Sequence, residues 1–227
     1  MRQQLIIDAD DTLWENNIYF ERAFDEFVQF LDHSTMPPAE VRSVLDAIEE
    51  ANARIHGYGI LNFGRNLRHT YERLAEREVR PEDLETVMGF ARRIFDCPIE
   101  TIAGVPETLA YLRPRHDLTL FTKGHPDEQR LKIDRSGLAK YFEHTAIVKE
   151  KDCEAYRRLV AGRGMDPART WMIGNSPKSD INPALAAGLH AVFIPHAHTW
   201  VLEKQEIAEA DGRLLALERF EDLRKHF

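Results

Sequence analysis

Short apolar runs and helical apolar stripes alternate along most of the chain. The run at 4–7 ends in polar residues and is typical of a buried strand. From residue 98 onward, further apolar runs predict strands, with helical patterns between them. The expected strands are 117–121, 145–148, 170–173 and 191–194, and the expected helices are 104–112, 126–136, 153–161 and 182–187. Strands that alternate with helices predict an α/β fold, a doubly wound parallel sheet covered on both faces.

The segment between the first strand and residue 98 has a different pattern. Its apolar residues recur at helical spacing on charged segments, as in Phe20, Phe24 and Phe27. Proline and glycine residues interrupt the stripes and predict about four helices with no clear strand. We therefore expect an α/β core made of 1–14 and 98–227, with an all-α cap at 15–97 inserted after the first strand. The aromatic stripe is expected to pack inside this cap.

Composition narrows the class of protein. A length of 227 residues with 43% hydrophobic content suits one domain, or a core with a smaller insert. The net charge of −8 argues against a nucleic-acid-binding surface. No stretch approaches the roughly 18 apolar residues of a membrane span, and the first strand leaves no room for a signal peptide. Cys97 and Cys153 lack metal-ligand spacing and are interpreted as reduced thiols in a cytoplasmic protein.

Polar side chains follow several of the expected strands. The first strand ends in Asp8-Ala9-Asp10-Asp11-Thr12, and the strand at 117–121 ends in Thr122-Lys123-Gly124. The strand at 170–173 is followed by GNSPKSD, and the one at 145–148 by two lysines. Sites in open α/β sheets form at the carboxyl ends of strands. We expect these carboxylates, the hydroxyl and a lysine to converge and to hold a divalent cation and a phosphoryl group.

In this respect the chain resembles the haloacid dehalogenase (HAD) superfamily, whose members are mostly phosphatases. The DxDxT signature of that family matches Asp8–Thr12, and its Thr or Ser at a strand end matches Thr122. A lysine near a helix start and the motif G-D-x4-D, here GNSPKSD, complete the set in the right order. The resemblance covers almost the full length and implies a Rossmann-like core with an inserted helical cap.

The resemblance also implies a role for each motif residue. Asp8 would be the nucleophile that forms an aspartyl-phosphate, and Asp10 the general acid and then the general base. Asp8, Asp10 through its backbone carbonyl, Asp180 and Asn175 would hold Mg²⁺. The phosphoryl group would be bound and its charge neutralised by the strand-end residues and the lysine, which are Thr122, Lys123, Gly124 and Lys151.

Two positions depart from the family pattern or leave it open. Asn175 stands where the family usually has a second acid, so this loop brings less charge to Mg²⁺. The lysine is either Lys149 or Lys151, and Lys151 is favoured because it directly precedes a helix.

Other patterns have structural interpretations beside functional ones. The acidic run also fits the first positions of a calcium loop, but the glycine and glutamate that such a loop needs are missing. His196 and His198 lack a third ligand for zinc. They are interpreted as exposed loop residues, with contact to a substrate phosphate as the alternative.

Several polar residues of the cap are candidates to recognise the leaving group of the substrate, namely Arg54, His56, Asn62, Arg65 and Arg68.

The function predicted from the sequence is Mg²⁺-dependent hydrolysis of a small phosphorylated metabolite. A phosphomutase of the same superfamily would share every motif. A non-catalytic phosphate-binding protein with this fold is supported only by Asn175. A dehalogenase of the superfamily would not need an acid at position 10, so Asp10 argues against that activity.

Overall fold

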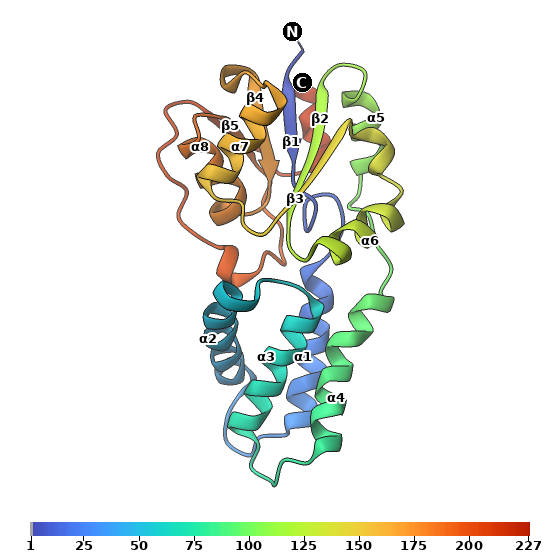
Figure 1. Cartoon of the computed structure of the whole chain (residues 1–227), viewed down its shortest axis with the longest axis vertical. Coiled ribbons are helices and arrows are strands. Elements are labelled where there is room, and N and C mark those ends of the chain that lie inside the picture. The colour runs from blue at the N-terminus through green and yellow to red at the C-terminus, as the bar shows by residue number, and fades with distance from the viewer. Residues whose placement is uncertain (1) are drawn as a thin grey trace. The chain divides into compact units, whose positions relative to one another are not determined.

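The chain divides into two compact units (Figure 1). The computed structural model describes residues 2–227, apart from the side chain of Arg54. One unit contains the chain up to Asn16 together with Ile99–Phe227, and the other is Asn17–Pro98. Every strand belongs to the first unit, and the second is helical. Among the described residues, no helix combines the length and apolar character that a bilayer crossing requires.

The first unit is built on a six-stranded parallel sheet in the order β3-β2-β1-β4-β5-β6. Its strands are β1 (Gln4–Ile7), β2 (Asp117–Lys123), β3 (His144–Val148), β4 (Thr170–Gly174), β5 (His190–Phe193) and β6 (Leu214–Ala216). Its α-helices are α5 (Val105–Leu112), α6 (Pro126–Ser136), α7 (Cys153–Arg163) and α8 (Asn182–Ala186). This arrangement confirms the predicted doubly wound α/β fold. Strand β6, which has only three residues, was not predicted from the sequence.

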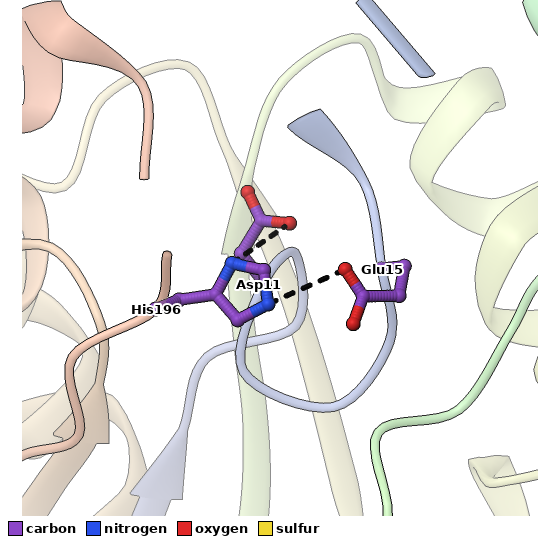
Figure 2. A group of neighbouring side chains, drawn as sticks. All are labelled: Asp11, Glu15 and His196. Carbon is purple, nitrogen blue, oxygen red and sulfur yellow. Dashed lines mark ion pairs between the residues drawn. The ribbon is translucent and has the colours of Figure 1, made fainter. Parts of the chain in front are cut away.

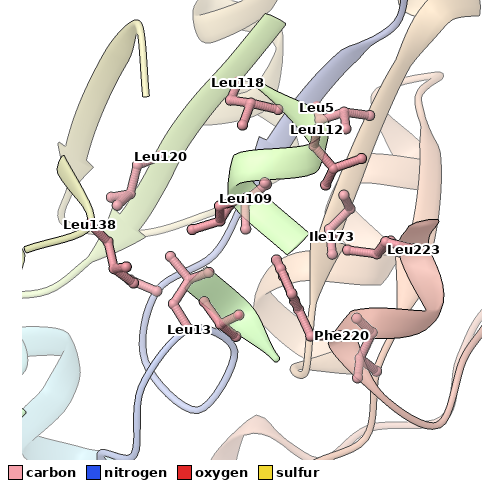
Figure 3. Close-up of a cluster of buried hydrophobic side chains, with 14 of the residues drawn as sticks. Leu5, Leu13, Leu109, Leu112, Leu118, Leu120, Leu138, Ile173, Phe220 and Leu223 are labelled. Atoms are coloured by element: carbon pink, nitrogen blue, oxygen red, sulfur yellow. The ribbon is translucent and has the colours of Figure 1, made fainter. Parts of the chain in front are cut away.

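Alternating residues of the central strand pack on opposite faces of the sheet, as the pleat of a strand requires. Leu5 and Ile7 join a buried cluster with side chains of α5, α6 and the 3₁₀ helix Phe220–Lys225 (Figure 3). Ile6 joins a second cluster, which α7 and α8 cover. Burial on both faces explains why the strands read as continuous apolar runs rather than as an alternating pattern.

The second unit packs its helices around a core of its own. The helices are α1 (Asn17–Leu31), α2 (Pro38–His56), α3 (Ile60–Leu74) and α4 (Pro81–Arg92), followed by a 3₁₀ turn at Arg93–Asp96. Phe24 and Phe27 are buried in this core, so the predicted packing role of the aromatic stripe is confirmed. Phe20 is partly buried and meets Phe63 edge to face.

The polar stretch at 54–68, which spans the end of α2, the turn after it and the start of α3, forms hydrogen bonds within itself. The amide of Asn62 donates to the backbone carbonyl of His56 at 2.6 Å and accepts from Arg65 at 2.9 Å. Arg68 pairs with Glu72 one turn along the helix. Asn62, Arg65 and Arg68 therefore stabilise the turn and α3, and their proposed reading of a substrate stays a prediction. The side chain of Arg54 lies outside the described residues.

The two segments that lead into and out of the helical unit run side by side in the first unit. The N–H of Glu15 donates to the carbonyl of Glu100 at 2.9 Å, and the N–H of Ile102 donates to the carbonyl of Leu13 at 3.0 Å. Between these bonds, Trp14 and Thr101 form an antiparallel bridge. The insertion therefore leaves and re-enters the core at neighbouring positions.

Candidate active site

The strand order places the first acidic motif at the topological switch point of the sheet. The chain leaves β1 for β2 on one side and later returns to β4 on the other. The N–H of Asp8, just after β1, donates to the carbonyl of Ile173 in β4 at 2.9 Å. A crevice at the carboxyl ends of such strands is where open α/β sheets bind their ligands. Asp8 and the loop after Gly174 therefore meet at this edge.

Lys151 lies between two buried carboxylates. Its ammonium group donates to Asp8 and, at 2.7 Å, to Asp180. Only 2% of the Lys151 side chain, 9% of Asp8 and 1% of Asp180 is exposed. The structure thus brings together three predicted site residues that are far apart in the sequence. Lys149 is exposed, so of the two candidate lysines it is Lys151 that contacts the predicted nucleophile.

Burial and neighbouring charges shift the pKa values of Asp8 and Lys151. Burial, followed by the neighbouring charge of Asp180, raises the pKa of Asp8 from 3.8 to about 7, although Lys151 opposes the shift. Burial also disfavours the charge of Lys151, but Asp180 and Asp8 outweigh it and raise the pKa of Lys151 above its usual value. One lysine does not fully compensate two buried carboxylates, so the group favours a further positive charge.

The loop after β4 is shaped to bring Asp180 against the strand. Residues Pro177–Ile181 form a π-helical turn, and the N–H of Ser176 donates to Asp180 at 3.0 Å. A Cβ atom on Gly174 would overlap the Asp180 side chain. The glycine of GNSPKSD is therefore required for close approach of the carboxylate, and alanine there would displace it.

Thr12 connects the two acidic motifs. Its hydroxyl donates to Asp8 at 2.9 Å and lies 3.4 Å from the Asn175 side-chain oxygen. The Asn175 amide donates to the Thr199 hydroxyl at 2.9 Å. This network orients the amide oxygen of Asn175 toward Thr12 and Asp8, where a metal ligand would be needed.

Asp10 has a separate set of partners. Lys132 lies 2.6 Å from both oxygens of its carboxylate, while Gln129 and Trp14 donate to one oxygen each, at 2.9 and 2.8 Å. Burial raises the pKa of Asp10, but Lys132, Gln129 and Trp14 together bring it below its usual value. Neither Gln129 nor Lys132 was among the site residues predicted from the sequence. The sequence feature that could have indicated them is their spacing: they lie three residues apart on α6, which begins shortly after Gly124, so their side chains share one helix face.

Thr122 and Lys123, at the predicted phosphate-binding end of β2, have different surroundings. Thr122 is buried within β2, opposite Ile147 of β3. The ammonium group of Lys123 lies 2.5 Å from Glu203 and 2.9 Å from the Ser179 hydroxyl. Glu203 in turn accepts from Ser176 at 2.6 Å. The side chain of Lys123 therefore ties β2 to the C-terminal segment, which sequence reasoning did not anticipate, and phosphate binding by 122–124 stays a prediction.

A third group of side chains flanks the nucleophile loop. His196 lies 3.7 Å from Asp11 and 3.3 Å from Glu15 (Figure 2). The three residues could together offer oxygen and nitrogen ligands. Asp11 is buried and adopts a positive φ of 59°, and its carboxylate accepts the N–H of Asn16. Only 16% of the His196 side chain is exposed, so its interpretation as an exposed loop residue is wrong, whereas that interpretation is confirmed for His198.

The residues around Asp8 fit a magnesium ion. Asp8, Asn175 and Asp180 offer hard oxygen atoms, which Mg²⁺ prefers, and the Asp10 carbonyl lies two residues after Asp8 in the chain. Burial raises the pKa of Asp8 most, and the nearby charge of Asp180 raises it further, so Lys151 alone does not offset the negative charge of the two carboxylates. Chemistry and charge therefore both suit a divalent cation.

The comparison with known proteins agrees with this geometry. The sequence profile of the haloacid dehalogenase-like hydrolases matches residues 4–188. The chain belongs to this hydrolase family. This match confirms the resemblance to HAD-like hydrolases that was inferred from Asp8–Thr12 and the three later motifs. The helices between β1 and β2 are consistent with the helical cap that such enzymes carry at this position.

Of two curated relatives, one is named as a nucleotidase and the other as a phosphatase. The chain is 26% identical to the pyrimidine 5′-nucleotidase YjjG of Escherichia coli over 206 residues, which is 86% of each chain. It is 33% identical to a phosphoserine phosphatase of Thermus thermophilus over 98 residues. That match spans only 39% of each chain.

Solved structures share the fold along the whole chain. A HAD-like family hydrolase from Xanthomonas campestris superposes with a TM-score of 0.86 and 29% identity, covering 99% of this chain and 90% of its own. The HAD hydrolase YfnB of Bacillus subtilis, solved bound to magnesium, gives a TM-score of 0.71 at 16% identity. That match covers 100% of this chain and 99% of YfnB.

Proposed function

We propose that this HAD-like hydrolase is a Mg²⁺-dependent phosphatase that cleaves a small phosphate monoester through an aspartyl-phosphate. The observation that carries the proposal is the contact of Lys151 with both Asp8 and Asp180 at the switch point of the sheet. A buried carboxylate beside a fixed cation is suited to attack an anionic phosphate. The nucleotidase and phosphatase names of the relatives support the same reaction class.

In the first step, a carboxylate oxygen of Asp8 forms a bond to phosphorus as the ester P–O bond breaks. The leaving alcohol oxygen takes a proton from Asp10. Lys151 neutralises charge on the phosphoryl oxygens, and Thr12 holds the attacking carboxylate by its hydrogen bond. The products of this step are the free alcohol and the aspartyl-phosphate.

In the second step, water attacks the phosphorus of the aspartyl-phosphate. Asp10, now ionised, takes the proton of that water, and the bond between phosphorus and Asp8 breaks. Asp8, Asn175, Asp180 and the carbonyl of Asp10 would hold Mg²⁺, which would supply charge to offset the repulsion between carboxylate and phosphate. Inorganic phosphate leaves, and both acids return to their starting states.

The test is release of inorganic phosphate, with Mg²⁺ or with EDTA. The panel contains p-nitrophenyl phosphate, nucleoside 5′-monophosphates, phosphoserine and sugar phosphates. Asp8→Asn removes the nucleophile with little change of shape, and Asp134→Asn, at an exposed position of α6, is the matched control.

We expect Mg²⁺-dependent release that Asp8→Asn lowers by at least about 10³-fold and the control leaves unchanged. Conversion of a sugar phosphate to its isomer without phosphate release would identify a mutase instead. Binding of phosphate esters without turnover would identify a binding protein. Release that persists in Asp8→Asn would contradict the proposed nucleophile.

A further inference from the structure

The carboxylate of Asp10 is surrounded by donors that the family motifs do not include. Lys132 reaches both of its oxygens at 2.6 Å. Gln129 donates to one oxygen at 2.9 Å, and the Trp14 indole donates to the other at 2.8 Å. Each oxygen thus accepts two hydrogen bonds, which together fix both the position of the carboxylate and the direction of its plane.

Two of these donors belong to one helix face. Gln129 and Lys132 are three residues apart on α6, so their side chains lie on the same side. The amide of Gln129 also donates to the backbone carbonyl of Lys123 at 3.0 Å. Gly124 has a φ of 138°, and a Cβ there would lie 2.9 Å from the Gln129 amide nitrogen. The glycine therefore leaves room for Gln129 between the end of β2 and Asp10.

Lys132 has a second partner near the same loop. Its ammonium group lies 3.1 Å from the side-chain oxygen of Asn16. About one fifth of the side chain of Lys132, and of Asp10, is exposed. A largely buried ion pair is weak evidence for a role in stability, because removing both charges from water offsets their attraction. The contacts of Lys132 with both oxygens of Asp10 and with Asn16 are better explained by a role in orienting the Asp10 carboxylate than by a role in stability.

We propose that Lys132, supported by Gln129, is a positioning residue that orients Asp10 for proton transfer to the leaving oxygen and holds the carboxylate that remains once the proton has left. This inference rests on the proposed phosphatase function, in which Asp10 is the general acid. Proton transfer requires the carboxyl oxygen within hydrogen-bond reach of the leaving oxygen, so a small rotation of the carboxylate is costly. Lys132 touches neither phosphate nor nucleophile in this assignment and acts through Asp10 alone.

The choice of leaving group separates this role from a merely structural one. p-Nitrophenolate is stable as an anion and departs without a proton, whereas an alkoxide requires one. Loss of the correct Asp10 orientation should therefore slow alkyl phosphates much more than p-nitrophenyl phosphate. A general loss of folded protein or of phosphate binding would slow both substrates equally. The value of kcat/KM reports the step in which the ester bond breaks.

The experiment compares Lys132→Met with wild type on p-nitrophenyl phosphate and on the best alkyl phosphate of the panel. Lys140→Met, at an exposed position beyond α6, is the matched control. We expect kcat/KM to fall about 10-fold to 100-fold on the alkyl ester and less than about threefold on p-nitrophenyl phosphate. Lys132→Arg should recover most of the loss, because a guanidinium group can also pair with both carboxylate oxygens.

A double variant tests whether Lys132 acts through Asp10. In the Asp10→Asn background, Lys132→Met should produce no further loss on the alkyl ester, since its target is already removed. If Lys132→Met does not fold, Gln129→Leu replaces it, with the same selective loss expected. Equal losses on both substrates, no loss, or additive losses with Asp10→Asn would overturn the inference. If wild type shows no Asp8-dependent phosphate release, the proposed function itself fails.

Discussion

The buried lysine between two carboxylates gives the sharpest prediction. In Lys151→Met, a side chain of similar length replaces the ammonium group that contacts Asp8 and Asp180. The two carboxylates then remain in the interior without their shared cation. Removing one partner from a buried ion pair typically costs about 3–5 kcal/mol, because the remaining charge is desolvated and unpaired.

This cost can be converted into a melting temperature. In a domain of this size, each kcal/mol corresponds to roughly 2–4 °C. We therefore expect Lys151→Met to lower the Tm by roughly 6–20 °C in EDTA at pH 8. Lys149→Met is the matched control, since Lys149 is exposed and only two residues away, and its Tm should change by less than about 2 °C.

The pH dependence of this loss has a definite sign. The pKa of Asp8 is raised in the folded protein, so the native state binds more protons than the unfolded state between pH 3.8 and about 7. Stability contributed by this group therefore decreases as the pH rises through that range. Without Lys151 the pKa should be higher still, and the difference in Tm between wild type and variant should be smaller at pH 6 than at pH 8.

Thermal unfolding followed by circular dichroism measures both effects, and Mg²⁺ provides a second readout. A divalent cation near Asp8 and Asp180 would replace part of the lost charge, so Mg²⁺ should raise the Tm of Lys151→Met more than that of wild type. Equal Tm values for Lys151→Met and Lys149→Met in EDTA would refute the ion-pair reasoning. Equal effects of Mg²⁺ on wild type and variant would refute the metal assignment.

Two further predictions concern the neighbouring loops. Lys123 and Ser176 outweigh the effect of burial and hold the pKa of Glu203 below its ordinary 4.5, so this stabilisation is present above pH 4.5 and is lost as the pH falls through the lowered pKa. In urea titrations, Glu203→Gln should therefore cost about 1–3 kcal/mol at pH 7 and progressively less in acid, and a constant difference would contradict this. Asn175→Asp adds a charge beside Thr12 and Asp8, so the Mg²⁺ concentration for half-maximal phosphate release should fall by about tenfold. An unchanged or higher Mg²⁺ requirement would show that Asn175 does not face the ion.

The sequence predicted the layers of the fold because local patterns encode them. Continuous apolar runs are typical of strands buried on both faces, and Leu5, Ile6 and Ile7 are fully buried. Lys151 was favoured for a local reason as well, since it directly precedes α7, whose first turn Asp152 caps. The short strand β6 has no such signal, because three residues form a strand only through pairing with β5.

Long-range side-chain pairs escaped prediction for a related reason. Lys132 and Asp10 are 122 residues apart, and Lys123 and Glu203 are 80 apart. No periodicity connects such positions, and each lysine lies on a segment that also has other charged residues. The sequence placed Lys123 near phosphate from its position in a motif, whereas its ammonium group contacts Glu203 and Ser179.

The paired segments at 13–15 and 100–102 have a consequence for how the sequence of this protein can evolve. They are hydrogen-bonded to each other within the core, so the ends of the inserted helices are already held together there. Lengthening an insertion whose ends are fixed in this way adds little loop-closure cost, because that cost grows only slowly with loop length. The helical unit also buries its own separate cluster of side chains. Residues 17–98 can therefore be exchanged, shortened or diversified as a module while the sheet and its acidic strand ends are inherited unchanged.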